Sequence, residues 1–232
     1  MALTHETLGV LCQGVNAWHT TRVQKLVNHV LAGTAHVLRD PRAELVLEQL
    51  YVGAQRAADE ARGAGDPGDF GFGCSPAQGE FLYLWCRSSG ARTAVQTVTS
   101  AGATAIYLAA ALRDNGGGLV ITADSRPERA QAARRNLAAA GLDRYAEVRC
   151  GDPLEVLADL PPDVDVLAVD GWPELAAPSR ARRMLELVQP RLRPGALVLN
   201  DGAEPDYVQY VRGPDSSLRT TFTDAGVLSV AL

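Results

Sequence analysis

Strand-like and helical segments alternate along the chain from residue 91 to the C-terminus. Each short segment rich in β-branched residues is followed by a helical pattern, and these segments read "TAVQTV", "LVITAD", "AEVRC", "VDVLAVD" and "GALVLND". Repeated β–α units predict a parallel sheet with helices on both faces. The tail "SLRTTFTDAGVLSVAL" predicts two further strands around an Asp-Ala-Gly turn. We therefore expect an α/β fold, a doubly wound and mostly parallel seven-stranded sheet with a closing antiparallel hairpin.

The chain before residue 75 predicts a different organisation. Apolar residues recur at helical spacing on both sides of Pro41. The segment 62–73, rich in glycine and aspartate, predicts a loop. We expect an N-terminal helical extension over residues 1–74 and the sheet domain over residues 75–232.

Composition excludes several classes of protein. The chain has 232 residues, of which 47% are hydrophobic and 21% charged, which is typical of a globular protein. A formal net charge of -5, without a basic stripe, argues against nucleic-acid binding. No apolar run is long enough to cross a membrane and the N-terminus has no signal-peptide pattern, so we expect a cytoplasmic protein. The four cysteines have no C-x-x-C spacing, which argues against a zinc site.

Two of the predicted helices have specific boundary signals. Ser125 and Glu128 predict a capping box at the helix that ends near Gly141. Leu185 and Leu192 are expected on one face of a later helix.

Acidic residues follow several of the predicted strands. In open α/β sheets, ligands bind at the carboxyl ends of the strands. Asp124 is placed either to accept hydrogen bonds from ribose hydroxyls, which its position favours, or to be a solvated acid in a loop. Asp170 and Asp201 end two successive strands, so they predict a divalent-cation pair, a general base, or two acids that cap helices or turns. Trp172 is placed either to stack on an adenine or to pack in the core.

Four segments in this order resemble the class I S-adenosylmethionine-dependent O-methyltransferases, closest to the catechol and caffeoyl-CoA type and its bacterial branch. They are "SPAQGEFL", "AVQTVTSAGATAIYLAAALRDNGGG", "ITADSRPERAQAARRNLAAAGL", and "VDVLAVDGW" with "LRPGALVLND". The resemblance covers the chain from about residue 75 onward and implies a Rossmann-like methyltransferase fold. It also implies transfer of a methyl group from S-adenosylmethionine to a small hydroxylated acceptor, and a homodimer in which the N-terminal helices close the acceptor pocket.

The resemblance also implies roles for individual residues. Cofactor contacts are expected from Val98, Gly102, Thr104, Asp124, Asp152, Asp170 and Trp172. Asp170 and Asp201 would bind a Mg-like divalent cation, and Asp170 would be the catalytic residue.

The sequence departs from the family pattern at functional positions. Gln96 replaces the motif acid, and Val98 replaces a glycine that lets the backbone approach the ligand. Gly202 replaces the Asn that follows the second metal-binding Asp, and Pro173 replaces a lysine that helps to take the acceptor's proton.

These departures leave two alternatives open. The first is a metal-independent enzyme whose base is Asp170, Asp201, Tyr207 or a histidine of the N-terminal segment. The second is a catalytically inactive relative that acts as a partner subunit or binds another small molecule.

Overall fold

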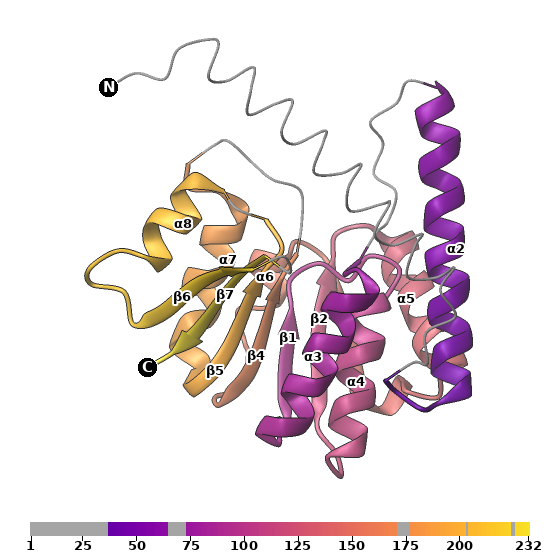
Figure 1. Cartoon of the computed structure of the whole chain (residues 1–232), viewed down its shortest axis with the longest axis horizontal. Coiled ribbons are helices and arrows are strands. Elements are labelled where there is room, and N and C mark those ends of the chain that lie inside the picture. Colours follow the sequence, from indigo (N-terminus) through magenta and orange to yellow (C-terminus); the bar gives the residue numbers. More distant parts are fainter. Residues whose placement is uncertain (1–36, 65–72, 171–176, 203, 224–225) are drawn as a thin grey trace.

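The computed structural model of the chain describes residues 37–64, 73–170, 177–202, 204–223 and 226–232. Its centre is a seven-stranded sheet in the order β3-β2-β1-β4-β5-β7-β6 (Figure 1). Neighbouring strands are parallel from β3 to β5, and β7 is antiparallel to both β5 and β6. The predicted fold class is thus confirmed. The strands are β1 Thr93–Gln96, β2 Leu119–Asp124, β3 Ala146–Cys150, β4 Val164–Val169, β5 Leu192–Asn200, β6 Leu218–Thr223 and β7 Gly226–Ala231.

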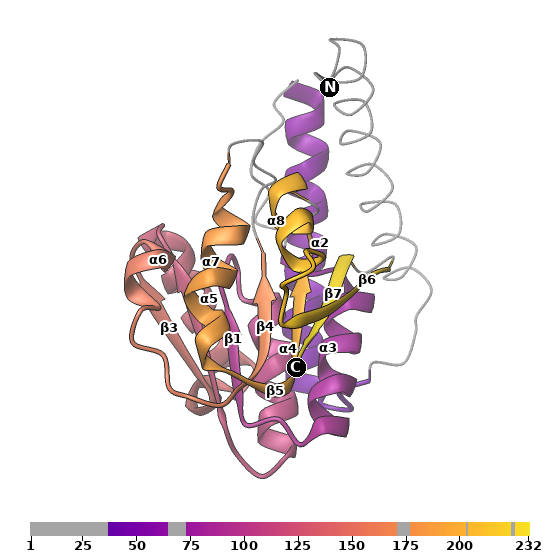
Figure 2. The ribbon, with the colours of Figure 1, turned by 90° about the vertical axis from the view of Figure 1, so that its left-hand side faces the viewer.

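Helices cover both faces of this sheet (Figures 1 and 2). They lie at α2 Pro41–Ala64, α3 Pro76–Ser89, α4 Ala103–Asp114, α5 Pro127–Ala139, α6 Pro153–Val156, α7 Arg180–Val188 and α8 Pro205–Val211, with single 3-10 turns at Asp143–Tyr145 and Gln189–Arg191. None of the helices in the described ranges is long and apolar enough to cross a membrane.

Side chains along each strand point alternately to the two faces of the sheet, so the buried side chains form two cores, one on each face. Ala94 of β1 and Val166 of β4 pack with α2, α3, α4 and α5, whereas their neighbours Val95 and Leu167 pack with α7 and α8. Successive strand residues point to opposite faces, so a sheet that is covered on both sides needs apolar residues at consecutive positions. This requirement explains why Val166 to Val169 of β4 form the continuous apolar run "VLAV".

Helix α4 is buried along most of its length, because α3 covers the side that turns away from the sheet. All residues from Ala103 to Leu112 are buried, and many are alanines that allow close packing. A Cβ atom at Gly79 of α3 would lie 2.2 Å from the Tyr107 ring of α4. Glycine at position 79 therefore sets the distance between the two helices.

Helix α2 confirms the helix predicted after Pro41. Its buried Tyr51 donates a hydrogen bond to the Cys74 carbonyl at 3.2 Å, and Arg42 donates to the Ala139 carbonyl of α5 at 3.1 Å. The far end of α2 extends past the carboxyl edge of the sheet (Figure 1). The other predicted N-terminal helix and most of the predicted loop lie outside the described residues.

Three local predictions differ from the structure. The N-cap of α5 is Arg126, without a side-chain cap, so the capping box from Ser125 is wrong; a capping box instead begins α3 at Ser75. Leu192 begins β5 rather than continuing α7, because the helix ends at Val188 and Pro190 follows in a 3-10 turn. Helix α8 was not predicted.

Candidate functional site

The loop after β1 is held by its own side chains and by the neighbouring strands. Gln96, fully buried, donates from Nε2 to the Val98 carbonyl at 2.6 Å. The Thr97 hydroxyl is 3.1 Å from both the backbone nitrogen and the carbonyl of Asp170. The Thr99 backbone nitrogen donates to the Ala123 carbonyl at 2.8 Å. The neutral amide of Gln96 therefore helps to fix the loop conformation by donating to the Val98 carbonyl. An ionised carboxylate at this position has no proton to donate and could not form this hydrogen bond.

Gly102 lies at the turn from this loop into α4. Its φ of 98° belongs to the left-handed region, and a Cβ atom there would lie 3.3 Å from the Ala133 backbone of α5. Both the backbone conformation and the close approach of α5 therefore favour glycine. Gly102, the one glycine of the loop between β1 and α4, therefore stands at the position where the turn requires glycine.

Asp124 ends β2 beside the same loop and is 2% exposed. Its Oδ2 accepts from the Ser100 backbone nitrogen at 2.9 Å, and its Oδ1 accepts from that of Arg126 at 3.0 Å. Ser100 has a positive φ of 53°. Each carboxylate oxygen has a further lone pair for a ligand hydroxyl. Asp124 thus both orders the loop and keeps capacity for the predicted ribose contact.

The other predicted cofactor contacts have structural partners too. Thr104, 2% exposed, accepts from the Cys74 backbone nitrogen at 3.1 Å and keeps its hydroxyl proton for donation. Asp152 is the N-cap of α6, accepting from the Leu154 backbone nitrogen at 3.0 Å, and it forms an ion pair with Arg180. Val98 is half-buried in the loop. Trp172 lies outside the described residues.

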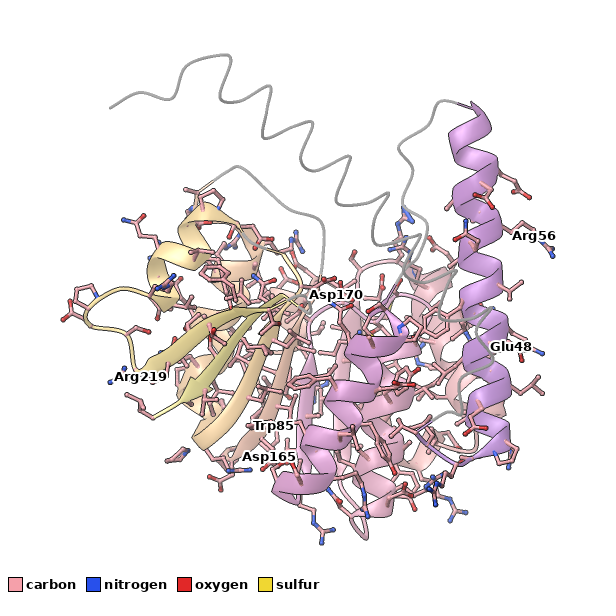
Figure 3. All side chains as sticks on the ribbon, viewed as in Figure 1. Glu48, Arg56, Trp85, Asp165, Asp170 and Arg219 are labelled. Atoms are coloured by element: carbon pink, nitrogen blue, oxygen red, sulfur yellow. The ribbon has the colours of Figure 1, made fainter. Side chains whose placement is uncertain are left out.

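Asp170 and Asp201 follow two neighbouring strands of the sheet. The last residues of β4 and β5, Val169 and Asn200, are paired in the ladder, so the two acids leave the sheet side by side. Asp170 is half-buried at the carboxyl edge, whereas Asp165 lies at the opposite end of β4 (Figure 3). Asp201 is 8% exposed, and its Oδ1 accepts from Gln78 Nε2 of α3 at 3.0 Å.

Glu204, which the sequence reasoning did not single out, lies close to Asp201 of the candidate site. Its side chain is buried, and Oε2 accepts from Asn200 Nδ2 at 2.9 Å. A Cβ atom built at Gly202 would lie 2.5 Å from Glu204 Oε1. Burial, together with the Asp206 and Asp201 carboxylates, raises the pKa of Glu204, although the Asn200 hydrogen bond opposes the shift. The available signal was the glycine at position 202, which leaves room for a nearby side chain.

Tyr207, a candidate base, is fully buried among the apolar side chains that line α7 and α8. Its hydroxyl has no hydrogen-bond partner among the described residues, and burial raises its pKa far above the usual range. A phenol in this position does not act as a base near neutral pH. The candidate histidines all lie outside the described residues.

The described residues contain no group of three or more His, Cys, Asp or Glu side chains arranged to hold a metal ion. Hard divalent cations take about six oxygen ligands. Position 202 supplies no side-chain oxygen, and Gln78 donates to the Asp201 carboxylate. The side chains present therefore do not fit the metal shell that the resemblance implied.

Comparison with known proteins shows which family part of the chain is similar to. Residues 98–202 match a family described as "Methyltransferase domain". The match covers less than half of the chain, so it shows that this segment is similar to methyltransferase domains. The matched segment begins at Val98 in the loop after β1 and ends at Gly202, so it contains the loop after β1 and the ends of β2, β3, β4 and β5.

The curated relatives that this chain matches are named as O-methyltransferases. A catechol O-methyltransferase of Niastella koreensis is 35% identical over 86 residues, 37% of this chain and 38% of the relative. A putative O-methyltransferase of Mycobacteroides abscessus is 31% identical over 140 residues, 58% of this chain and 61% of the relative. The matched part thus spans less than two thirds of these relatives' length.

Solved structures extend the similarity over more of the chain. A putative O-methyltransferase from Klebsiella pneumoniae is 25% identical with a TM-score of 0.57, covering 80% of this chain and 89% of that chain. An O-methyltransferase of tomaymycin synthesis from Streptomyces achromogenes, solved with S-adenosylmethionine, is similar in fold, at 24% identity and a TM-score of 0.55, covering 77% of this chain and 89% of that chain.

Proposed function

We propose that this protein is an S-adenosylmethionine-dependent O-methyltransferase that acts on a small hydroxylated acceptor. The observation that carries the proposal is the pairing of the Gly102 turn with Asp124 across the ends of β1 and β2, inside the segment that matches the methyltransferase domain. The relatives named as O-methyltransferases support the choice of acceptor atom and favour an active enzyme over an inactive relative.

The residues around the loop have complementary roles in binding the donor. The free lone pairs of Asp124 accept the ribose hydroxyls. The Thr104 hydroxyl donates toward the methionine carboxylate, at the N-terminal end of α4, where the helix dipole favours negative charge. Asp152 and Trp172 border the adenine, and the backbone at Val98 lies against the ligand.

When bound, S-adenosylmethionine supplies an electrophilic methyl group on a positively charged sulfur. What the protein must add is positioning of the acceptor oxygen and removal of one proton. Asp170, half-buried at the centre of the carboxyl edge, orients the acceptor hydroxyl. No cation is needed for this role.

The N-terminal segment 1–74 provides, in this proposal, the cap over the acceptor pocket and the contacts of a cytoplasmic homodimer. Leu45 and Val52 of α2 support it, since they are 54% and 44% exposed and lie two helical turns apart on one side of the helix. Light scattering of the full chain tests the dimer, and a monomer at micromolar concentration contradicts it.

Calorimetric titration with S-adenosylmethionine tests the donor, and methyl transfer to a panel of phenols and catechols tests the reaction. We expect saturable binding and a methylated product. Absence of binding at millimolar donor would refute the proposal and favour the inactive relative. Glu186→Gln, a change on the exposed face of α7, serves as a control that keeps both activities.

A further inference from the structure

The carboxylate of Glu204 occupies the space next to Gly202 where the side chain of any other residue would begin. A Cβ atom at position 202 would lie 2.5 Å from Oε1 and 2.9 Å from both Cδ and Oε2 of Glu204. These distances are below any normal contact with a Cβ atom. Gly202 and Glu204 therefore form one unit, in which the absence of a side chain at 202 makes room for the carboxylate.

The hydrogen bonds around this unit fix the carboxylate in place. Asn200, the last residue of β5, donates from Nδ2 to Glu204 at 2.9 Å and accepts from the Gly202 backbone nitrogen at 2.8 Å. Asn200 and Glu204 are 2% and 4% exposed. One amide thus holds both the turn and the carboxylate, at the end of the strand that leads into Asp201.

Within the described part of the chain, the Glu204 carboxylate is buried without a positively charged partner, which is uncommon for an acidic side chain. Among the described residues Glu204 forms no ion pair with a cation, and the carboxylates of Asp206 and Asp201 raise its pKa further. A buried carboxylate without a cationic partner is costly and is rarely kept for stability alone. Groups with these surroundings are concentrated at functional sites, where a carboxylate that holds a proton more tightly is a better base.

We propose, on the basis of the proposed function, that Glu204 is the residue that takes the acceptor's proton, in a site that works without a divalent cation. The proton of the acceptor hydroxyl passes to the Glu204 carboxylate. The oxygen forms a bond to the methyl carbon of the donor, and the carbon–sulfur bond breaks with its electron pair staying on sulfur. The products are the methyl ether, neutral S-adenosylhomocysteine and the protonated side chain.

Two variants test the proton transfer by different means. Glu204→Gln removes the base but keeps the size of the side chain, and we expect kcat to fall on the order of 100-fold or more. Gly202→Ala keeps the base but pushes its carboxylate aside, so kcat should fall as well. The affinity for S-adenosylmethionine should stay within about threefold, and the melting temperature of Glu204→Gln should not fall, because the variant removes a buried charge.

A purely structural role would give the opposite result, with a lower melting temperature and a kcat close to that of the wild type. A Glu204→Gln variant with kcat within about threefold of the wild type would overturn the proposal. Glu186→Gln, the same chemical change on the exposed face of α7, is the matched control.

A titration with manganese chloride tests whether the protein has a cation site. It is carried out with the protein saturated with S-adenosylmethionine and with no acceptor present. We expect no binding with sub-millimolar affinity, and methyl transfer that is unchanged by a chelator. A sub-millimolar site that Asp201→Asn abolishes, or activity that a chelator removes and manganese restores, would overturn the proposal. Failure of the proposed function is distinct, since it would appear as a wild-type protein that does not bind S-adenosylmethionine.

Discussion

The Ser100 backbone nitrogen donates to the Asp124 carboxylate at 2.9 Å, and this contact joins the loop after β1 to the end of β2. Both residues are 2% exposed, and Ser100 has a positive φ of 53°. The acid that is expected to hold the ribose is therefore also the acid that holds the loop in its conformation. Changes in donor binding at this position have to be separated from changes in loop structure.

Replacement of Asp124 by Asn is expected to weaken both the fold and donor binding. The amide can no longer accept with both of its polar atoms, so one of the two backbone donors at Ser100 and Arg126 loses its partner, at a cost of about 1–3 kcal/mol in the free energy of unfolding. Denaturant unfolding and calorimetric titration measure the two effects. Donor affinity should fall by more than tenfold under conditions where the variant is fully folded, and an unchanged affinity would contradict the ribose role. Asp143→Asn, at an exposed position, is the control.

Gln96→Glu, which restores the motif acid of the family, is expected to destabilise this protein. The buried Gln96 amide donates to the Val98 carbonyl, and an ionised carboxylate cannot replace this donor. We expect a loss of about 2–3 kcal/mol at neutral pH. Burial should raise the pKa of the new carboxyl in the folded state, so the loss should shrink as the pH falls below that pKa.

Unfolding of the Gln96→Glu variant across the pH range from about 4 to 8 measures this effect, with exposed Gln131→Glu as the control. A variant as stable as the wild type at neutral pH would mean that the loop does not depend on the amide.

Asp165 is expected to contribute to the acid sensitivity of the fold. Burial alone would raise its pKa, but hydrogen bonds from the Arg92 and Thr93 backbone nitrogens and from the Arg193 guanidinium outweigh burial and hold the pKa below its usual value. A depressed pKa stabilises the fold above the unfolded-state pKa of about 3.9, and this contribution is lost as the pH falls through the folded-state value.

Asp165→Asn should accordingly cost about 1.5–3 kcal/mol at pH 7 and progressively less as the pH falls below about 4. Unfolding by urea at several pH values checks this, and exposed Asp163→Asn is the comparison. A stability difference that stays constant down to pH 2 would argue against the assigned hydrogen bonds.

Tyr207→Phe should leave methyl transfer unchanged and should not lower stability. The Tyr207 hydroxyl is buried without a partner among the described residues, so its removal relieves an unsatisfied polar group. Tyr51→Phe is the matched control, because the Tyr51 hydroxyl donates to the Cys74 carbonyl, and its loss should cost about 1 kcal/mol. Loss of activity in Tyr207→Phe, with the melting temperature preserved, would restore Tyr207 as a candidate base.

The sequence by itself determined the order of the strands along the chain and, to within a residue or two, the positions where they end. The alternation typical of strands and the 3.6-residue repeat typical of helices can be read from neighbouring residues alone. These patterns locate the element ends, and with them residues such as Asp124 and Gly102. The fold class, the closing hairpin and the acids at the carboxyl edge were predictable for this reason. Helix α8 was missed because its seven residues, Pro205–Val211, carry too little periodicity to stand out.

Only the tertiary structure decided what each polar side chain does. Asp201 meets Gln78 across 123 positions of sequence, and Asp124 meets Ser100 across 24. Gly202 appeared in the sequence only as a missing ligand, whereas in three dimensions it makes room for the Glu204 carboxylate. A carboxylate becomes a metal ligand, a cap or a base according to its burial and its hydrogen-bond donors, and chain folding brings these donors from distant segments.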